Sequence, residues 1–440
     1  MSSAAAAAAN NLAPPKWEWN WVMLERFVFR RDDDESFPDE SKAPMRASGT
    51  TSWGAPFLVA FKLADPPAIS RLYAQLSGFP PDPSKQATSL DILATHRHLA
   101  LFRPQQQPCL FLLTQTTPPF TLPHMDDTLI CRRRRLLGPP PPDHDWRRRV
   151  MTIASMGVLS RGEREFAVAE VKFFYGRRTL RSDKVYADIF WLRSSSPVPG
   201  GGAIVDGQWK SARVPVLASS SSSGDKSHPI TWQDFSWQTD TVVPVHNRLC
   251  WVNNYRGILF CDLFQEPTPT LSLVRFPSTD DDVRTIPASC RRLYCGASAI
   301  DAGRALKFVR GGRGFTITCQ TLVLDTMVWS KDYTVTSDEL WSVNPPEHLP
   351  RSILMFPQVK VDRPHILHFL ITDDFSRYVV MKKMWVVTID MDTRVAHSCF
   401  QYINGREDTG TEDADLTQQK SMCPDSFLPC ELFKSLHISR

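Results

Sequence analysis

The 440-residue sequence has no hydrophobic run that approaches the roughly 20 residues needed to cross a bilayer. It also lacks a strong excess of either charge, because 51 basic and 47 acidic residues leave a net charge of +4. A charge this small over this length does not indicate nucleic-acid binding by itself. The first ten residues carry an alanine run with no basic segment before it, so a secretory signal is not expected. We therefore predict no membrane association and no nucleic-acid partner.

The sequence lacks the motifs that mark common reaction centres. No Gly-x-Ser-x-Gly elbow is present, so a hydrolase-fold serine has no candidate position. No cysteine or histidine pair has the two-plus-two spacing of a structural zinc site. The closest pairs are Cys290 with Cys295, Cys423 with Cys430, His96 with His98, and His365 with His368. We read them as core thiols and polar histidines, and predict no catalytic residue, no cofactor and no metal ligand.

Phosphate-binding loops are missing as well. The glycine-rich segment 311–314 is expected to join two strands, so it has no helix N-terminus that would hold a phosphate. A hairpin turn explains its glycines better. The ten cysteines are scattered, and several lie inside apolar runs, as Cys250 and Cys319 do. This usage is typical of reduced, buried thiols, and it predicts a cytoplasmic or nuclear location, or both.

What the sequence does contain is a succession of short apolar runs separated by its 35 proline and 20 glycine residues. Such runs predict strands. We expect strands at 56–63, 166–175, 185–192, 209–217, 242–245, 248–253, 257–264, 271–276, 305–309, 315–324, 328–333, 366–372, 385–390 and 396–403, and another after Trp17. Groups of these strands recur every 40 to 60 residues. This pattern predicts a mainly β fold, a β-propeller-like array of small antiparallel sheets with a few short helices.

Two helices are expected outside this pattern. Asp65 followed by proline is a favourable helix start, and Ile69, Leu72, Tyr73 and Leu76 recur at helical spacing. The apolar end 427–436 is a candidate for a docking helix. We also expect a polar loop at 31–51. The predicted organisation is a disordered tail at 1–16, the propeller-like domain at 17–405, and a C-terminal tail at 406–440.

A segment at 247–262, Asn-Arg-Leu-Cys-Trp-Val-Asn-Asn-Tyr-Arg-Gly-Ile-Leu-Phe-Cys-Asp, resembles the plant family called domain of unknown function 1618. Segments 21–28, 61–70, 206–211, 305–309 and 337–341 support the resemblance in the family's order. It covers roughly residues 17–405. The resemblance implies membership, but no agreed activity and no catalytic residues. Within the motif we expect structural roles for Cys250, Trp251, Tyr255, Arg256, Gly257 and Asp262.

The most singular local feature is a pair of arginine clusters in an exposed, proline-rich loop at 131–149, which departs from the family pattern. The clusters consist of Arg132, Arg133, Arg134 and Arg135, and of Arg147, Arg148 and Arg149. Their spacing fits a bipartite nuclear-import signal, an anion-binding surface, or a solvated loop.

Three functions remain open. The leading hypothesis is a non-enzymatic interaction module for a protein partner. The second is a hydrolase acting on a glycan or ester through carboxylates gathered in a central channel, with Asp280–Asp282, Asp373–Asp374 and Asp390 with Asp392 as the paired acids. The third is a nuclear factor that uses the arginine clusters. Solvated turn residues are the commoner explanation of such acids.

Overall fold

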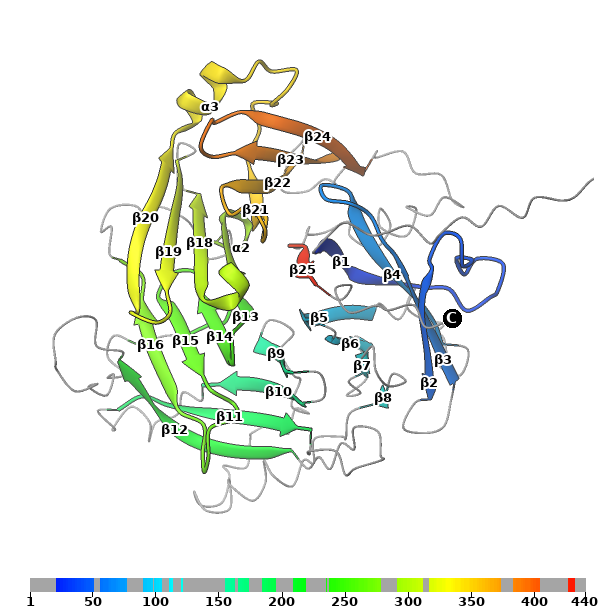
Figure 1. Ribbon diagram of the computed structural model, residues 1–440, viewed down its shortest axis with the longest axis vertical. Helices are drawn as coiled ribbons and strands as arrows, with labels where there is room; N and C mark the ends of the chain where they lie inside the picture. Colours follow the sequence, from blue (N-terminus) through cyan, green and yellow to red (C-terminus); the bar gives the residue numbers. More distant parts are fainter. Residues whose placement is uncertain are drawn as a thin grey trace, which may run out of the picture.

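The computed structural model describes residues 21–50, 56–76, 90–97, 99–104, 111–113, 120–121, 155–162, 165–173, 184–194, 209–218, 235, 237–277, 291–311, 316–372, 383–403 and 426–431. Almost all regular structure in these residues is β-strand. Figure 1 shows the strands as small sheets placed around a common centre.

The first sheet joins the two ends of the described chain. Its strands are β1 (Val22–Arg30), β2 (Met45–Thr50), β3 (Pro56–Lys62), β4 (Ile69–Gln75), β5 (Leu90–His96), β6 (Leu99–Pro104), β7 (Phe111–Leu113), β8 (Phe120–Thr121) and β25 (Leu428–Cys430). They lie in the order β25-β1-β4-β3-β2-β8-β7-β6-β5. The C-terminal strand β25 runs antiparallel to β1 and places Cys430 opposite Val22. Two sequence groups, β1–β4 and β5–β8, thus share one sheet.

The second sheet also combines two groups of consecutive strands. It contains β9 (Met156–Arg161), β10 (Glu165–Lys172), β11 (Tyr186–Arg193), β12 (Lys210–Ala218), β13 (Thr241–Val245), β14 (Arg248–Asn253), β15 (Gly257–Cys261) and β16 (Leu271–Arg275). Within each group the strands pair antiparallel with their sequence neighbours. The groups meet where β12 runs parallel to β16.

Two four-stranded antiparallel sheets complete the described fold. They are β17 (Cys295–Ile300), β18 (Ala305–Gly311), β19 (Ile317–Val323) and β20 (Val328–Val335), then β21 (Met355–Val359), β22 (Ile366–Thr372), β23 (Met384–Asp390) and β24 (Ala396–Ile403). The helical segments are α2 (Arg291–Tyr294), η5 (Asp301–Gly303) and α3 (Ser337–Val343). A capping box starts α3, because Thr336 accepts from the Glu339 N–H and Glu339 accepts from the Thr336 N–H.

Neighbouring groups pack face to face around the centre. The first strands of successive groups contact one another: β1 with β5, β5 with β9, β9 with β13, β13 with β17, and β17 with β21. The hydrophobic clusters lie between groups. One joins Phe260 of β15 to Phe308 of β18, and another joins Phe29 of β1 to Leu370 of β22. The fold is mainly β, and it is propeller-like because each sheet covers its faces with the next one. Both features agree with the prediction from the sequence.

The structure corrects three local predictions. The helix expected near residues 66–76 is wrong, because Ile69–Gln75 form β4 between β1 and β3. This strand is buried on both faces, so it shows no simple alternation and its apolar residues imitate helical spacing. The polar loop at 31–51 contains strand β2, and the apolar C-terminal end contributes β25 where a helix was expected. β2 forms a hairpin with the next strand, β3, whereas β25 is determined by pairing with β1 at the other end of the chain.

Candidate functional site: the central channel

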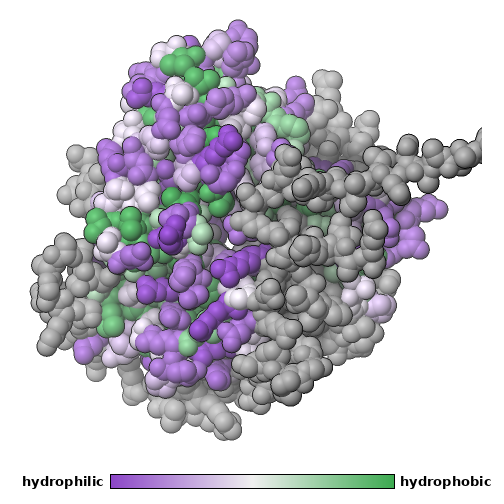
Figure 2. Space-filling model, in the orientation of Figure 1, coloured by the Kyte–Doolittle hydropathy of each residue, from purple (hydrophilic) through white to green (hydrophobic). Residues whose placement is uncertain are grey.

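The inner strands surround a cavity of about 510 Å³ at the centre of the array, called the central channel below. Its lining comes from β1, β5, β9, β13, β17 and β21, with residues 426–429 at the C-terminal strand. Figure 1 shows β1, β5, β9, β13, β21 and β25 around the middle of the molecule, and Figure 2 shows hydrophilic residues on one side of the middle of this face. The volume lies in the range of ligand pockets.

Three charged side chains line the described part of the channel: Arg26, Asp240 and Arg292. Arg26, on β1, donates from Nε to the Ser426 carbonyl at 2.8 Å and from Nη1 to the Leu93 carbonyl at 3.4 Å. These bonds tie β1 to β5 and to the C-terminal strand. Two guanidinium groups against one carboxylate give this lining a positive balance, which favours an anionic ligand.

Arg292 reaches the channel from α2, just before β17. Its Nη2 donates to the Asp240 carbonyl at 3.0 Å, and its Nε lies 3.9 Å from Asp240 Oδ1. The second carboxylate oxygen of Asp240 accepts from the Asn254 N–H at 2.8 Å. Asp240 therefore connects the arginine to the β14–β15 hairpin and fixes where the guanidinium lies.

Asn254 contributes the most unusual polar group of the channel. The residue is only 5% exposed, and its Oδ1 has no hydrogen-bond partner among the described residues. An unpaired buried acceptor costs about 1–3 kcal/mol relative to a paired one. A ligand that donates a hydrogen bond at this position would recover that free energy.

The hairpin that holds Asn254 is built by the family motif. Asn253 Oδ1 accepts from the N–H groups of Tyr255 at 3.0 Å and Arg256 at 2.9 Å, which closes the turn. Gly257 has a φ of +144°, and a Cβ there would overlap the Val274 carbonyl oxygen. Only glycine satisfies both conditions. The guanidinium of Arg256 lies 5.6 Å from the centre of the Tyr255 ring.

The remaining motif residues lie in the core and at a strand end. Trp251 is fully buried and donates from Nε1 to the Ser155 carbonyl at 2.8 Å, which links β14 to the start of β9. Burial raises the pKa of the Cys250 thiol well above its usual range, so this thiol is held neutral. Asp262 Oδ1 accepts from the Phe264 N–H at 2.9 Å and closes the turn after β15. Within the motif, Asn254 is the residue that lines the channel, and the other motif residues hold its hairpin in place.

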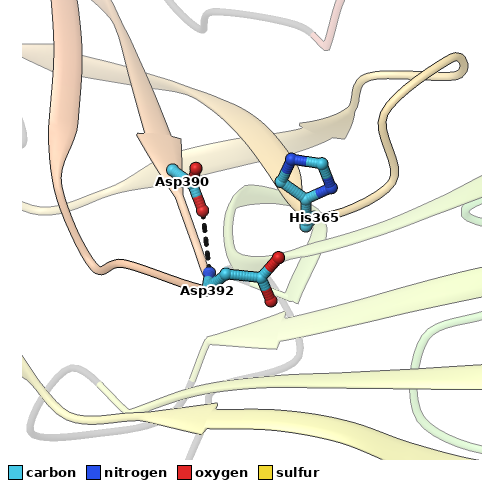
Figure 3. Close-up of side chains that lie close together, drawn as sticks. All are labelled: His365, Asp390 and Asp392. Atoms are coloured by element: carbon cyan, nitrogen blue, oxygen red, sulfur yellow. Dashed lines mark hydrogen bonds between the residues drawn. The ribbon is translucent and has the colours of Figure 1, made fainter.

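A second cluster of polar side chains lies away from the channel, at the β23–β24 turn (Figure 3). His365, Asp390 and Asp392 hold possible ligand atoms within 4.8 Å of one another. Asp390 Oδ1 accepts from the N–H groups of Asp392 at 2.8 Å and Thr393 at 3.2 Å, and Asp392 Oδ1 accepts from the Tyr333 hydroxyl at 2.6 Å. These are the bonds of a closed turn, and we assign the two acids to that role.

The electrostatics of Asp390 agree with this assignment. Burial acts to raise its pKa, but the Thr393 and Asp392 N–H groups outweigh that effect and hold the pKa below its usual value. Asp390 therefore stays ionised at neutral pH, as a turn cap does. A proton donor for glycoside hydrolysis needs the opposite shift.

The histidine and cysteine pairs of the sequence are not brought together as ligand sets among the described residues. His368 is buried and hydrogen-bonds Thr388 Oγ1 at 3.0 Å, whereas His365 lies in the turn before β22. His96 Nδ1 accepts from the Ser160 N–H at 2.8 Å. Cys295 and Cys430 are buried, and their sequence partners Cys290 and Cys423 lie outside the described residues.

Several predicted features fall outside the described residues. These are the arginine clusters Arg132–Arg135 and Arg147–Arg149 and the acid groups Asp280–Asp282 and Asp373–Asp374. Nuclear import or anion binding by the arginine clusters, and catalysis by the acids, therefore stay predictions. In the described lining of the channel Asp240 is the one carboxylate, so the pair of acids expected of a channel glycosidase is not assembled there.

Sequence reasoning missed the channel residues Arg26, Asp240, Asn254 and Arg292. Arg26 did carry a signal, because it follows Glu25 inside an otherwise apolar strand. Asn254 lies within the family motif, where the sequence gives it no separate role. Asp240 comes just before a strand, and Arg292 follows a polar segment. Nothing in the local sequence of either residue shows that the two side chains meet.

The similar solved structures share little sequence with this chain. Solved structures similar to this chain include a putative TolB from Agrobacterium tumefaciens, which is 12% identical over 70% of this chain and 80% of that chain, with a TM-score of 0.27. They also include the Nup133 β-propeller domain of Vanderwaltozyma polyspora, 10% identical over 73% and 74%, with a TM-score of 0.31.

No curated protein matches the chain. Among the described residues, no helix is long and apolar enough to span a membrane. The family resemblance read from the sequence is confirmed over residues 251–368, which match the family described as Protein of unknown function (DUF1618).

Proposed function

We propose that the protein is a non-enzymatic β-propeller-like module that binds an extended segment of a protein partner in its central channel. The observation that carries the proposal is the channel itself, a cavity of about 510 Å³ lined by the inner strands of successive strand groups. Recognition at the middle of a ring of sheets needs no moving part. The rigid inner strands hold the binding groups in place.

The chemistry of the lining favours a peptide. The lining includes uncharged polar side chains, such as Thr95, Thr241 and Gln358, and apolar ones, such as Val242 and Ala297. A peptide in extended form presents both polar backbone groups and side chains, and so can contact both kinds of lining group. The polar groups come from several strand groups, so a chain that runs through the channel contacts more of them than a compact small molecule would.

The test selects peptides from a displayed random library on the immobilised protein, and then measures their affinity for two matched variants. Thr241→Trp places a large ring in the channel at the start of β13, and Thr334→Trp places the same ring on the exposed outer strand β20. We expect Thr241→Trp to weaken the selected peptides at least tenfold and Thr334→Trp to leave them within twofold.

Two results would contradict the proposal. One is binding that is equally strong in the Thr241→Trp variant, which would place the peptide elsewhere. The other is specific turnover of a glycan or ester by the purified protein, lost in the same variant. Thermal unfolding of both variants verifies that each is folded before its affinity is compared.

A further inference from the structure

We infer that the segment bound in the central channel is acidic, with a carboxylate side chain at Arg292 and a backbone amide at Asn254. The inference rests on the proposed function and names the chemistry of the partner. It depends on three observations: the exposure and position of Arg292, the unpaired amide oxygen of Asn254, and the place of Asp240 between them.

Arg292 is held in position while most of its donors remain available. Its one hydrogen bond among the described residues is the Nη2 contact with the Asp240 carbonyl, and its side chain is 48% exposed. The Asp240 carboxylate is 3.9 Å away, too far for a hydrogen bond. A guanidinium carries several N–H donors in one plane, so an incoming carboxylate can be bound through two of them.

Asn254 specifies a peptide group. Its Oδ1 is buried without a partner, and the residue lines the channel next to Asp240. A peptide unit has both an N–H and a C=O, and can therefore satisfy a side-chain amide in either orientation. A phosphodiester offers acceptors alone and cannot donate to the Asn254 oxygen, whereas a peptide unit can both donate and accept. The pair Asn254 and Arg292 thus favours an acidic peptide over a nucleic acid.

Asp240 lowers the affinity of Arg292 for a ligand carboxylate, because it already interacts with the guanidinium. Its carboxylate accepts from the Asn254 N–H at 2.8 Å and faces the Arg292 guanidinium. An acidic segment therefore competes with one long ion pair inside the protein. Removing the charge of Asp240 while keeping its shape leaves Arg292 without that competitor, and the affinity for an acidic segment should rise.

The experiment measures dissociation constants by fluorescence anisotropy for labelled peptides taken from the library selection. Each peptide is made in three forms, with its acidic residue as Glu, Gln or Lys. For the Glu form, we expect Arg292→Gln to weaken binding about tenfold and Asp240→Asn to tighten it about threefold. For the Gln form, both changes should be within twofold. Asn254→Ala should weaken both forms to the same extent.

Arg304→Gln is the matched control, because Arg304 is exposed and pairs with Asp301 on η5, outside the channel lining. It should leave all affinities unchanged. A binding loss in Arg292→Gln that is equal for the Glu and Gln forms would overturn the acidic preference.

The outcomes separate the inference from the proposed function. If peptides bind and Thr241→Trp abolishes binding, but no acid is preferred, the inferred acidic preference is wrong. Peptide binding in the channel is then still supported. If no peptide binds, or binding ignores Thr241→Trp, both fall. If single-stranded DNA of equal charge competes with the Glu form at equal concentration, the partner is polyanionic in general and the peptide assignment falls.

Discussion

The inner and outer strands of the strand groups differ in burial and in chemistry. Every residue of the inner strand β21 is buried, whereas the outer strand β20 exposes Val328, Ser330, Lys331, Asp332 and Thr334. Inner strands contact the next group on one side and the channel on the other. Outer strands such as β20 and β24 each pair on one edge only within the described sheets.

This difference separates the residues that stabilise the fold from those that form the candidate binding site. Residues where neighbouring groups meet determine stability, because their side chains fill the space between sheets. Residues at the outer edge contribute less, and charged or polar side chains there protect an unpaired strand edge. An unpaired buried polar group at the channel does not stabilise the fold, which is why Asn254 identifies the channel as the candidate site.

The largest expected effect compares two tryptophans. Trp251→Ala removes a fully buried ring and its bond to the Ser155 carbonyl, and should lower the free energy of unfolding by about 4 kcal/mol. Trp329→Ala on β20 removes a partly exposed ring bonded to the Arg275 carbonyl, and should cost about 1 kcal/mol. Urea unfolding measures both. Equal losses would contradict the distinction between the packed interior of the groups and their outer strands.

The next effect concerns the C-terminal strand. Leu428, opposite Leu24 of β1, is buried, so Leu428→Asp places a carboxylate in the core and should cost about 3 kcal/mol. Phe400→Asp is the control, because Phe400 is 44% exposed on β24. It should change stability by less than about 0.5 kcal/mol. A small loss in Leu428→Asp would show that β25 is dispensable for the first sheet.

A third comparison tests the close approach of two inner strands. A Cβ at Gly296 of β17 would overlap the Pro357 carbonyl oxygen of β21, so Gly296→Ala should cost about 2 to 3 kcal/mol. At Gly311, on β18, an added Cβ lies 3.4 Å from Tyr294. Gly311→Ala should cost about 1 kcal/mol or less. Thermal unfolding ranks the two variants, and the reverse order would show that β17 and β21 can separate without loss.

The smallest effect is a pH dependence. Burial lowers the pKa of His368 from 6.5 to about 4, and Lys360 acts in the same direction. The unfolded chain therefore binds a proton that the folded chain rejects, and stability falls as the pH drops from 6.5 toward 4. At pH 5 this difference amounts to about 2 kcal/mol.

His368→Gln should flatten that part of the pH profile, measured by urea unfolding at pH 7, 6 and 5. The control is His397→Gln on β24, whose side chain is 50% exposed. It should keep the wild-type slope because the His368 ring is still present. A wild-type slope in His368→Gln would place the titrating group elsewhere.

The strands were predictable where local sequence and tertiary environment agree. The β13–β14–β15 hairpins have apolar runs, turn residues and the positive-φ Gly257, and each signal indicates the same structure. Prediction failed at β4, β2 and β25. β2 forms a hairpin with β3, but its sequence Met-Arg-Ala-Ser-Gly-Thr contains no apolar run. β4 and β25 both pair with β1, which is distant from them in the sequence. Such pairings leave no local trace.

The sequence alone determined the mainly β class, the recurrence of short strand groups, and the family motif at 247–262, because period-2 apolar runs and turn residues act within a few positions. The tertiary structure decided which strands face the centre and that Asp240, Asn254 and Arg292 meet there. Arg26 and Ser426 are 400 residues apart in the chain, yet they share a hydrogen bond. Only closure of the whole array brings such residues to one channel.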